Sequence, residues 1–259
     1  MSDQPKILIS QKEAIVRIQF NRPEKKNALN KEMYDAAREA LIAADQNESV
    51  RVVYFTGSGD SFTAGNDLKD FRMPSSDDAA SNMTSNEPSP ASKFIKQISI
   101  TETPIVAAVN GMAIGVGTTM LLHCDLVYAA PNAVFLMPFV DLGAVPEAAS
   151  SYLLPQMVGQ RRAAELLMLC ERFDATTAAM LGIINDAVSA DKLESYAWGK
   201  AEALANKPPQ ALRQTKLMLK RGNQQAVAET IPYEMELFGE RLRSDEAQAV
   251  IQAMMSRKK

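Results

Sequence analysis

The alternation of apolar and polar side chains changes period several times along the first part of the chain. Residues 6–20 follow the period-two pattern of two half-buried strands around a turn, and residues 21–30 (NRPEKKNALN) interrupt it with a proline and asparagines. Apolar positions then recur at helical spacing, and Asn30 stands where it can cap that helix. These apolar positions are Met33, Ala37, Ala40 and Leu41. A β-branched run over residues 50–57 follows, so we expect a strand–helix–strand progression.

The same progression returns after a polar interruption. Residues 74–92 combine Ser, Asn, Asp and Pro with almost no bulky apolar side chain, which predicts a mobile loop. Residues 94–130 then have the pattern of helix, buried strand, glycine turn, apolar helix and strand, and residues 133–139 resemble a third strand. From about Glu147 onward the pattern is mostly helical. The chain is therefore predicted to be an α/β protein with amphipathic helices in its C-terminal part.

The balance of charge and hydropathy narrows the range of partners. The 259 residues carry 28 Lys and Arg against 31 Asp and Glu, and no domain-sized segment is strongly basic, so nucleic acid is not an expected partner. No apolar run approaches the ~18 residues of a membrane span, and the N-terminus lacks the pattern of a secretory leader. We expect a cytoplasmic protein that does not enter the membrane.

Cysteine and histidine are too few to indicate a metal site. Cys124 and Cys170 lie far apart in apolar surroundings, which is typical of buried thiols rather than of a disulfide framework. His123 is the only histidine. Without clustered cysteines we expect no metal, and we expect His123 to be a structural side chain whose hydrogen bonding is satisfied.

A first candidate turn lies in residues 58–71 (SGDSFTAGNDLKDF), after a strand that ends near Gly57. Gly65 can turn the backbone inward and leave N–H groups without intrahelical partners at the start of a helix expected near Asp67. Such donors can bind an anion, although an ordinary capped helix start explains the same residues.

A second candidate turn lies in residues 104–129, where a buried strand enters a glycine-rich segment and then an apolar helix. Free N–H groups around Gly115, Val116 and Gly117 would sit at the positive end of that helix, where the macrodipole favours negative charge. The glycine spacing does not fit a dinucleotide fingerprint, and the GK[ST] ending of a phosphate-binding P-loop is absent.

Three segments in this order and spacing resemble the crotonase (enoyl-CoA hydratase/isomerase) superfamily: NRPEKKNALN, SFTAGNDLKDF and AAVNGMAIGVGTTMLLHCDLVYAA. The resemblance covers essentially the whole chain. It implies a spiral of repeated ββα units over residues 1–195 and a C-terminal helical trimerisation region over residues 196–259. It further implies a homotrimer or a dimer of trimers, with acyl-CoA as the substrate and no separate cofactor, because coenzyme A is part of the substrate.

Mapped onto this sequence, the resemblance places the thioester carbonyl oxygen between the backbone N–H groups of Asn66 and Val116. Many reactions of the family pass through an enolate-like thioester, and preorganised donors that stabilise its oxygen each contribute roughly 3–4 kcal/mol. Lys25 lies in the loop that borders the coenzyme A moiety in relatives, where a cation attracts phosphate. The residues expected to contact the acyl-CoA are Lys25, Ala64, Gly65, Asn66, Asp67, Leu68 and Gly115.

Departures from the family pattern point to the reaction. Enoyl-CoA hydratases use two glutamates, but Thr119 and Phe139 occupy the matching positions here. One carboxylate does match: Glu147 lies in a segment that resembles the monofunctional enoyl-CoA isomerases, although Ala148 and Ala149 follow it where glycine is usual. A single base suits a 1,3-proton shift, and apolar surroundings would raise its pKa. A helix start also favours a glutamate in its first turn without any catalytic role.

We therefore expect an isomerase that converts 3-enoyl-CoA to trans-2-enoyl-CoA, with Glu147 as proton shuttle and Asn66 and Val116 as oxyanion hole. The alternatives are another crotonase-type reaction, namely that of an enoyl-CoA hydratase, an acyl-CoA thioesterase or a decarboxylase, and a non-catalytic acyl-CoA-binding relative. Asp141, the carboxylate nearest to Glu147 in the sequence, is expected to be a solvated loop residue.

Overall fold

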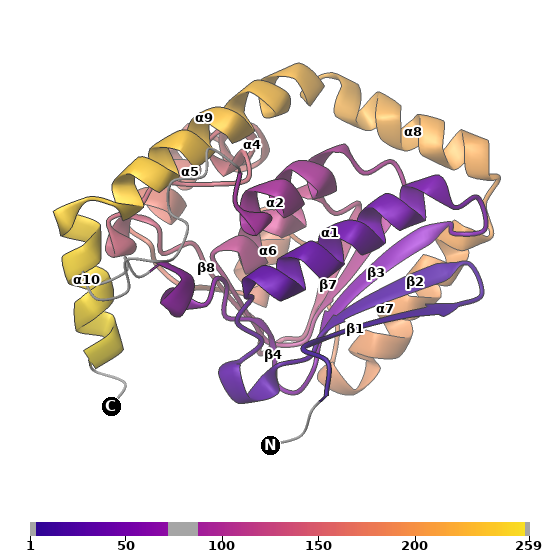
Figure 1. Ribbon diagram of the computed structural model, residues 1–259. Helices are drawn as coiled ribbons and strands as arrows, with labels where there is room; N and C mark the ends of the chain where they lie inside the picture. Colours follow the sequence, from indigo (N-terminus) through magenta and orange to yellow (C-terminus); the bar gives the residue numbers. More distant parts are fainter. Residues whose placement is uncertain (1–3, 72–87, 257–259) are drawn as a thin grey trace.

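The computed structural model describes residues 4–71 and 88–256, which form two sheets surrounded by helices (Figure 1). In the larger sheet the first two strands form an antiparallel hairpin, and all other neighbours are parallel. Its strands, in spatial order, are β1 (Ile7–Lys12), β2 (Ile15–Phe20), β3 (Val52–Gly57), β5 (Ile105–Val109), β7 (Leu126–Ala129) and β10 (Asp186–Ala187).

The smaller sheet is assembled by the same repeats that build the larger one. Its strands, in spatial order, are β4 (Ser61–Thr63), β6 (Met112–Ile114), β8 (Val134–Leu136) and β9 (Phe173–Asp174). Each of the pairs β3–β4, β5–β6 and β7–β8 places one strand in each sheet, and the chain then passes on to the next pair. The chain thus has the mixed α/β architecture, a spiral of ββα units, that the resemblance implied.

The larger sheet is covered by helices on both faces (Figure 1). Val53 and Phe55 of β3 face the core that includes α1 (Lys31–Gln46) and α2 (Pro90–Ile100). The alternate residues Val52 and Tyr54 face α7 (Ala190–Ala205) instead. Because both faces are buried, the strand is apolar throughout rather than alternating, as is usual for parallel sheets.

The hydropathy pattern predicted the long elements well and the short ones poorly. The hairpin and the capped helix are confirmed: the Asn30 side chain accepts a hydrogen bond from the Met33 N–H at the start of α1. Helix α2 begins at Pro90, so the loop predicted for residues 74–92 ends too late, and its residues 74–87 lie outside the described part. The β4 and β6 strands were missed, because three residues give too few positions to define a period.

The predicted apolar helix after the second turn is also corrected. It divides into one α-helical turn, α3 (Val116–Thr119), and a 3-10 turn, η4 (Met120–His123). The helical region placed from about Glu147 begins with α4 (Ser150–Val158), and the strand predicted for residues 133–139 is confined to β8. The start of η2 (Leu68–Phe71) replaces the helix expected near Asp67.

Asn27 organises the segment NRPEKKNALN. Its backbone is left-handed, with φ of 56°, and its side chain is fully buried. The side-chain amide donates to the carbonyl oxygens of Ser58 (2.8 Å) and Ser61 (2.7 Å), and its oxygen accepts from the Arg22 N–H (2.8 Å). The Thr63 hydroxyl also donates to the Asn27 carbonyl oxygen (2.7 Å). Asn27 thereby fixes the loop before β4 and, through Thr63, the turn that follows it.

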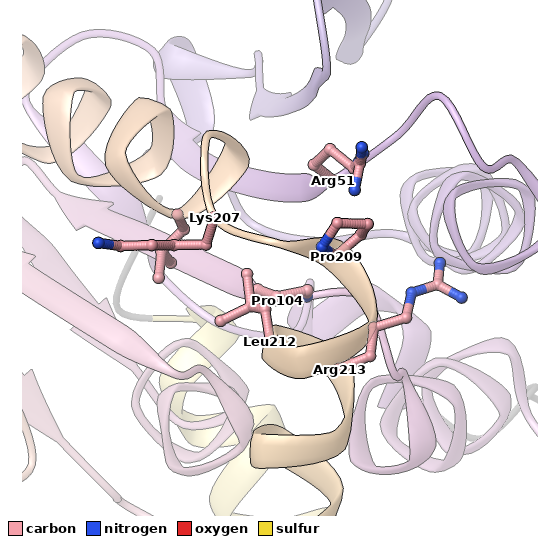
Figure 2. Close-up of a pocket in the computed structure, with 7 residues that line it drawn as sticks. Arg51, Pro104, Lys207, Pro209, Leu212 and Arg213 are labelled. Carbon is pink, nitrogen blue, oxygen red and sulfur yellow. The ribbon is translucent and has the colours of Figure 1, made fainter.

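Helix α8 (Pro209–Arg221) starts beside the sheet, where a small cavity has a basic rim (Figure 2). The cavity volume is about 10 Å³, which has room for about one water molecule and none for a larger ligand. The residues that line it are Arg51, Pro104, Leu204, Lys207, Pro209, Leu212 and Arg213.

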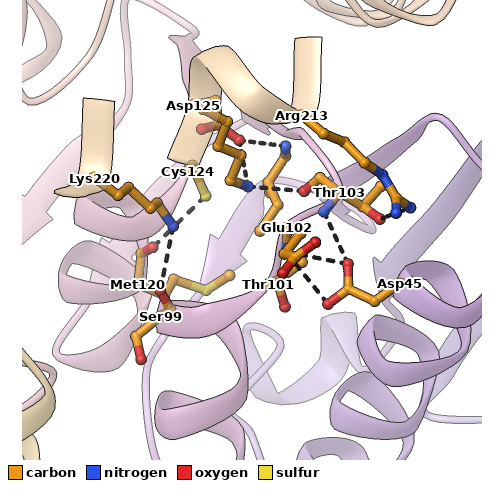
Figure 3. Close-up of polar contacts among 12 residues, drawn as sticks. Asp45, Ser99, Thr101, Glu102, Thr103, Met120, Cys124, Asp125, Arg213 and Lys220 are labelled. Carbon is orange, nitrogen blue, oxygen red and sulfur yellow. Dashed lines mark hydrogen bonds and ion pairs between the residues drawn. The ribbon is translucent and has the colours of Figure 1, made fainter. Parts of the chain in front are cut away.

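A polar cluster joins the same helix to the loops that precede the interior strands β5 and β7 (Figure 3). Lys216 is buried, pairs with Asp125 (2.7 Å) and donates to the Thr103 carbonyl oxygen (2.8 Å). Asp45 of α1 accepts the Thr103 N–H (2.8 Å). Folding removes these charged and backbone groups from much of their contact with water. Their mutual hydrogen bonds offset the cost of burying them.

The remaining helices, α9 (Gln224–Leu242) and α10 (Asp245–Ser256), continue along one side of the molecule (Figure 1). Helix α9 packs against α2 and α4. The predicted division between residues 1–195 and 196–259 stays a prediction, and its boundary falls inside α7, whose apolar side packs on the larger sheet. None of the helices in the described ranges is long and apolar enough to span a membrane.

Replacing Asn27 by alanine is expected to lower the free energy of unfolding by about 3 kcal/mol, because buried backbone groups lose their partners and alanine tolerates the left-handed backbone poorly. Urea unfolding followed by circular dichroism would measure the loss. Lys25→Ala, at an exposed position in the same segment, is the control and is expected to change the stability little. Equal stability of the Asn27 variant and the wild type would contradict this role.

Candidate active site

The first turn is held so that Gly65 touches the neighbouring strand. The Gly65 N–H donates to the Thr63 hydroxyl (3.0 Å), and Gly65 adopts a φ of 82°. A Cβ at this position would lie 2.5 Å from the Ile114 carbonyl oxygen. Only glycine therefore permits both the left-handed conformation and the close approach to β6.

Asn66 is turned so that its N–H lies outside the backbone ladder. The Leu29 N–H donates to the Gly65 carbonyl oxygen (2.8 Å), and the Asp67 N–H donates to the Leu29 carbonyl oxygen (2.9 Å). These two bonds flank Asn66 and make no use of its own N–H, which points away from Leu29 because successive peptide groups of an extended chain alternate in direction. The Arg22 guanidinium pairs with the Asp67 carboxylate (2.7 Å) and fixes the far side of the turn.

The second turn lies against the first. Gly115 has a φ of 57°, and its N–H donates to the Leu136 carbonyl oxygen (2.8 Å). Val116 is the first residue of α3, where backbone N–H groups have no intrahelical acceptor. A Cβ on Gly117 would lie 2.5 Å from the Thr63 Cγ2, so α3 packs directly on the strand that leads into the first turn.

The two turns together form a candidate oxyanion hole. Neither the Asn66 N–H nor the Val116 N–H has an acceptor among the described residues. Gly65 contacts Ile114, and Val116 follows Ile114 by two residues, so the two donors belong to adjacent segments. Backbone donors held in this way need no reorganisation when a substrate oxygen gains negative charge.

Glu147 is a buried carboxylate without a salt-bridge partner in the described part of the chain. Its side chain is 1% exposed, and its Oε1 has no hydrogen-bond partner among the described residues. Burial, and secondarily the charge of Glu234, raises the pKa of Glu147 from 4.5 to about 8. The direction is the one expected from apolar surroundings, and the value suits a group that takes up and returns a proton near neutral pH.

The backbone that follows Glu147 is bent and held by two buried polar side chains. Ala148 and Ala149 both have left-handed conformations, with φ of 60° and 54°. His123 contacts the Ala148 carbonyl oxygen through its Nε2 (2.8 Å). Burial lowers the pKa of His123 to about 4, so the ring is neutral and donates this hydrogen bond. The hydrogen bond expected for a buried histidine is therefore present, and its structural role stays a prediction.

Having alanine instead of glycine at positions 148 and 149 has an energetic cost. Positions 148 and 149 are left-handed, and glycine adopts that conformation at no steric cost. Alanine costs roughly 1–2 kcal/mol at each such position. The neighbouring hydrogen bonds must supply this energy to keep the bend.

Tyr34 connects the first turn with the base and was not identified from the sequence. Its hydroxyl donates to the Asn66 Oδ1 (2.6 Å), and the side chain is 3% exposed. Burial, with a contribution from the negative charge of Glu147, raises the pKa of Tyr34 well above its usual value of 10. In the sequence Tyr34 belongs to the apolar side of a helix, and nothing in that pattern indicates a site residue.

The other predicted residues lie as follows. Thr119 and Phe139 are buried, and neither can act as a base; the Phe139 ring lies edge-on to Phe238 at 6.3 Å. Asp141 is exposed, as expected for a solvated residue. Lys25 is exposed in η1 (Pro23–Lys25), and Ala64 donates its N–H to the Lys26 carbonyl oxygen (2.8 Å). Contacts of acyl-CoA with all the residues expected to bind it remain predictions, namely Lys25, Ala64, Gly65, Asn66, Asp67, Leu68 and Gly115.

In the described ranges, no three His, Cys, Asp or Glu side chains are grouped in a way that could hold a metal ion. Glu147 and Glu234 are two carboxylates that interact through their charges, without a third ligand. The Nε2 of His123 is already hydrogen-bonded to the Ala148 carbonyl oxygen. The chemistry that Glu147 can supply is proton transfer, and the two turns supply a pair of backbone donors.

Comparisons with known proteins agree on one family. The family model described as enoyl-CoA hydratase/isomerase matches residues 10–259. Human enoyl-CoA delta isomerase 2 is 31% identical over 97% of this chain and 64% of its own length, so the chain spans just under two thirds of that relative. The 2,3-dehydroadipyl-CoA hydratase of Escherichia coli (strain K12) is 31% identical over 90% of this chain and 88% of its own. An enoyl-CoA hydratase/isomerase structure from Pseudoalteromonas atlantica T6c has a TM-score of 0.89 at 38% identity, with 98% of both chains covered.

Gly65→Ala is expected to lower the free energy of unfolding by about 2–4 kcal/mol, because the added methyl group meets the Ile114 carbonyl and the backbone is left-handed. The matched control is Gly199→Ala in the interior of α7, where a Cβ meets nothing within 4 Å. Alanine should stabilise that helix position by up to about 1 kcal/mol. Urea unfolding of both variants checks the prediction, and similar effects at the two sites would contradict it.

The raised pKa of Glu147 makes the protein's stability depend on pH. Because the folded pKa lies above the unfolded value, the protonated group stabilises the fold fully at low pH, and this contribution is lost as pH rises from about 4.5 through about 8. Relative to Glu147→Gln, the wild type should lose up to about 1.4 kcal/mol per pH unit in that window. Urea unfolding at pH 5, 6, 7 and 8 measures the difference. A difference independent of pH would contradict the buried, protonated state.

Proposed function

The chain belongs to the enoyl-CoA hydratase/isomerase family of the crotonase superfamily, and from this premise we propose that it converts 3-enoyl-CoA to trans-2-enoyl-CoA. The observation that carries the proposal is Glu147, a buried carboxylate with an unpartnered oxygen and without a second glutamate at position 119 or 139. Its charge acts on Tyr34, whose hydroxyl binds the side chain of Asn66 in the donor pair.

The oxyanion hole supplies the first requirement of this reaction. The thioester oxygen would accept the N–H groups of Asn66 and Val116. Removal of a proton from C2 moves negative charge onto this oxygen, and donors already in place stabilise it more than they stabilise the ground-state carbonyl. The hydrogen bond from Tyr34 fixes the Asn66 side chain and limits movement of the turn that carries the donor.

Glu147 supplies the second requirement. Its carboxylate takes the proton from C2, the electron pair of that C–H bond forms a C1–C2 double bond, and the carbonyl π electrons move onto the thioester oxygen, which gives a dienolate with the C3–C4 double bond. The protonated Glu147 then returns the proton to C4, where the C3–C4 π electrons bond it. The C1–C2 pair becomes the C2–C3 double bond, and the carbonyl is restored. The overall change moves the double bond by one position without gain or loss of atoms, so one group that alternates between protonated and ionised states is sufficient.

Hydration is the alternative that related proteins raise, because hydratases are also similar to this chain. Addition of water requires a group that positions and activates it. Thr119 already contacts the Gly115 carbonyl oxygen (3.4 Å), and Phe139 is apolar. This distribution of side chains favours isomerisation over hydration.

The oligomeric state forms part of the same proposal. We expect a homotrimer or a dimer of trimers, and Met218 and Leu219 of α8, which are 74% and 79% exposed, provide apolar surface for contacts between copies. Light scattering coupled to size-exclusion chromatography gives the mass directly. A monomer at micromolar concentration would refute this part.

Purified protein incubated with 3-hexenoyl-CoA should produce a conjugated 2-enoyl thioester, followed by ultraviolet absorbance. Glu147→Gln should lower kcat by about 10²–10⁴-fold while acyl-CoA binding, measured by calorimetry, is kept. For the wild type kcat/KM should rise with pH through about 8, because the base acts in its ionised form. Glu236→Gln, an exposed glutamate of α9, is the control.

Parallel incubations separate the alternatives. Formation of a 3-hydroxyacyl-CoA from crotonyl-CoA without isomerisation would replace the proposal by hydration. Release of free coenzyme A would indicate a thioesterase, and release of carbon dioxide from a carboxyacyl-CoA a decarboxylase. Binding of acyl-CoA with no turnover of any of these would indicate a non-catalytic relative.

A further inference from the structure

We propose that Glu234, on α9, is a positioning residue that holds the start of α4 so that Glu147 keeps its place. Glu234 lies 85 residues from Ala149 in sequence, yet its Oε2 accepts the Ala149 N–H at 2.6 Å and its Oε1 accepts the Ser151 N–H at 3.0 Å. The side chain is 3% exposed. Both carboxylate oxygens are therefore committed to backbone donors of one bend.

The bend needs an external acceptor because it cannot satisfy its own donors. The residue before α4 is Ala149, which has no side-chain acceptor to cap the helix. Backbone N–H groups at a helix start lack intrahelical partners, and a carboxylate at this end also interacts favourably with the helix dipole. Glu234 thus performs the capping that a Ser, Thr or Asp at position 149 would provide locally.

The same hydrogen bonds stabilise the left-handed residues. Ala148 is fixed through its carbonyl by His123, and Ala149 through its N–H by Glu234, so each left-handed alanine has a buried side chain bound to it. A Glu147 main chain held on its C-terminal side by two separate elements has little freedom to rotate. This rigidity is what a proton shuttle needs, because the carboxylate must reach C2 and C4 without leaving the site.

Glu234 also acts on Glu147 through its charge. When ionised, it adds to the effect of burial in raising the pKa of Glu147. Burial raises the pKa of Glu234 itself, against the lowering effect of its hydrogen bonds with Ser151 and Ala149. His123 on η4 binds this bend, and Tyr34 on α1 interacts electrostatically with Glu147. Both side chains are neutral near pH 7. The other titratable side chains on helices packed against α4 and α9 include Lys93 and Lys96 on α2, Tyr152 on α4, Glu165 on α5, Lys220 on α8 and Glu246 on α10.

The inference rests on the proposed role of Glu147 as base, but not on which acyl-CoA reaction it serves. Its test therefore combines a structural readout with a catalytic one. The variants are Glu234→Gln, which keeps one acceptor and removes the charge, Glu234→Ala, which removes both, and Glu236→Gln, which removes an exposed charge from the same helix.

Amide hydrogen exchange followed by NMR is the structural readout. In Glu234→Ala the amides of Ala149 and Ser151 should exchange at least about ten-fold faster than in the wild type, because they lose their acceptor. Glu236→Gln should leave both rates unchanged. Unchanged exchange in Glu234→Ala would overturn the proposal, as would equal acceleration in the control.

The second readout is the titration of Glu147, followed by the carbon-13 chemical shift of its labelled carboxyl group. Glu234→Gln should shift the midpoint to lower pH by roughly half a unit or more, because the neighbouring negative charge is gone. With 3-hexenoyl-CoA the rising limb of kcat/KM should move in the same direction, and Glu234→Ala should lose kcat about 10–100-fold with little change in KM. An unshifted midpoint, or a loss confined to KM, would overturn the proposal.

Failure of the proposed function gives a different pattern. If wild-type protein does not isomerise 3-hexenoyl-CoA, the proposed function falls, whereas the exchange rates and the Glu147 midpoint still decide the role of Glu234. Since Glu234→Gln preserves the size of the side chain and one acceptor, it replaces Glu234→Ala in these measurements if Glu234→Ala does not fold.

Discussion

The close approach of two glycine turns is the constraint on which the rest of the site depends. Gly65 lies against the Ile114 carbonyl, and Gly117 lies against Thr63, so the loop after β4 and the start of α3 can only pack together without side chains at these positions. Their packing fixes the directions of the Asn66 and Val116 N–H groups. The candidate oxyanion hole is thus a property of backbone geometry, and the proposed binding of negative charge does not depend on the side chains at positions 66 and 116.

The buried polar side chains around this centre are mutually supporting. Asn27 and Thr63 hold the first turn, Tyr34 binds the side chain of Asn66, and His123 and Glu234 hold the bend beyond Glu147. A buried polar group is costly unless it is hydrogen-bonded, so each of these side chains favours one arrangement of its neighbours. Two neighbouring groups are exceptions among the described residues: the Glu147 Oε1 and the Ser150 Oγ have no hydrogen-bond partner, and the pKa of Glu147 is raised to about 8. The hydrogen-bonded side chains around them offset the cost of burying these two groups.

The repeats explain how such a site arises from a simple chain pattern. Each ββα unit places one strand in each sheet, so the ends of β4, β6 and β8 are neighbours although they are far apart in sequence. The turns after β4 and β6 carry the donors, and the segment after β8 leads to Glu147. Helix α9, which follows the ββα units in sequence, contacts this segment through Glu234, which accepts the Ala149 N–H.

The sequence by itself determined the long, regular parts of the protein and the backbone chemistry of the turns. Hydropathy periods predicted the β1–β2 hairpin, α1 with its Asn30 cap and the buried strands, and glycines at 65, 115 and 117 indicated anion-binding turns, because these signals are local. The strands β4 and β6 were too short to show a period. Only the tertiary structure could identify Tyr34 and Glu234, since one resembles a core aromatic and the other a helix glutamate until their partners are known. The pKa of Glu147 was likewise decided there, because burial and a neighbouring charge are contributed by residues that folding brings together.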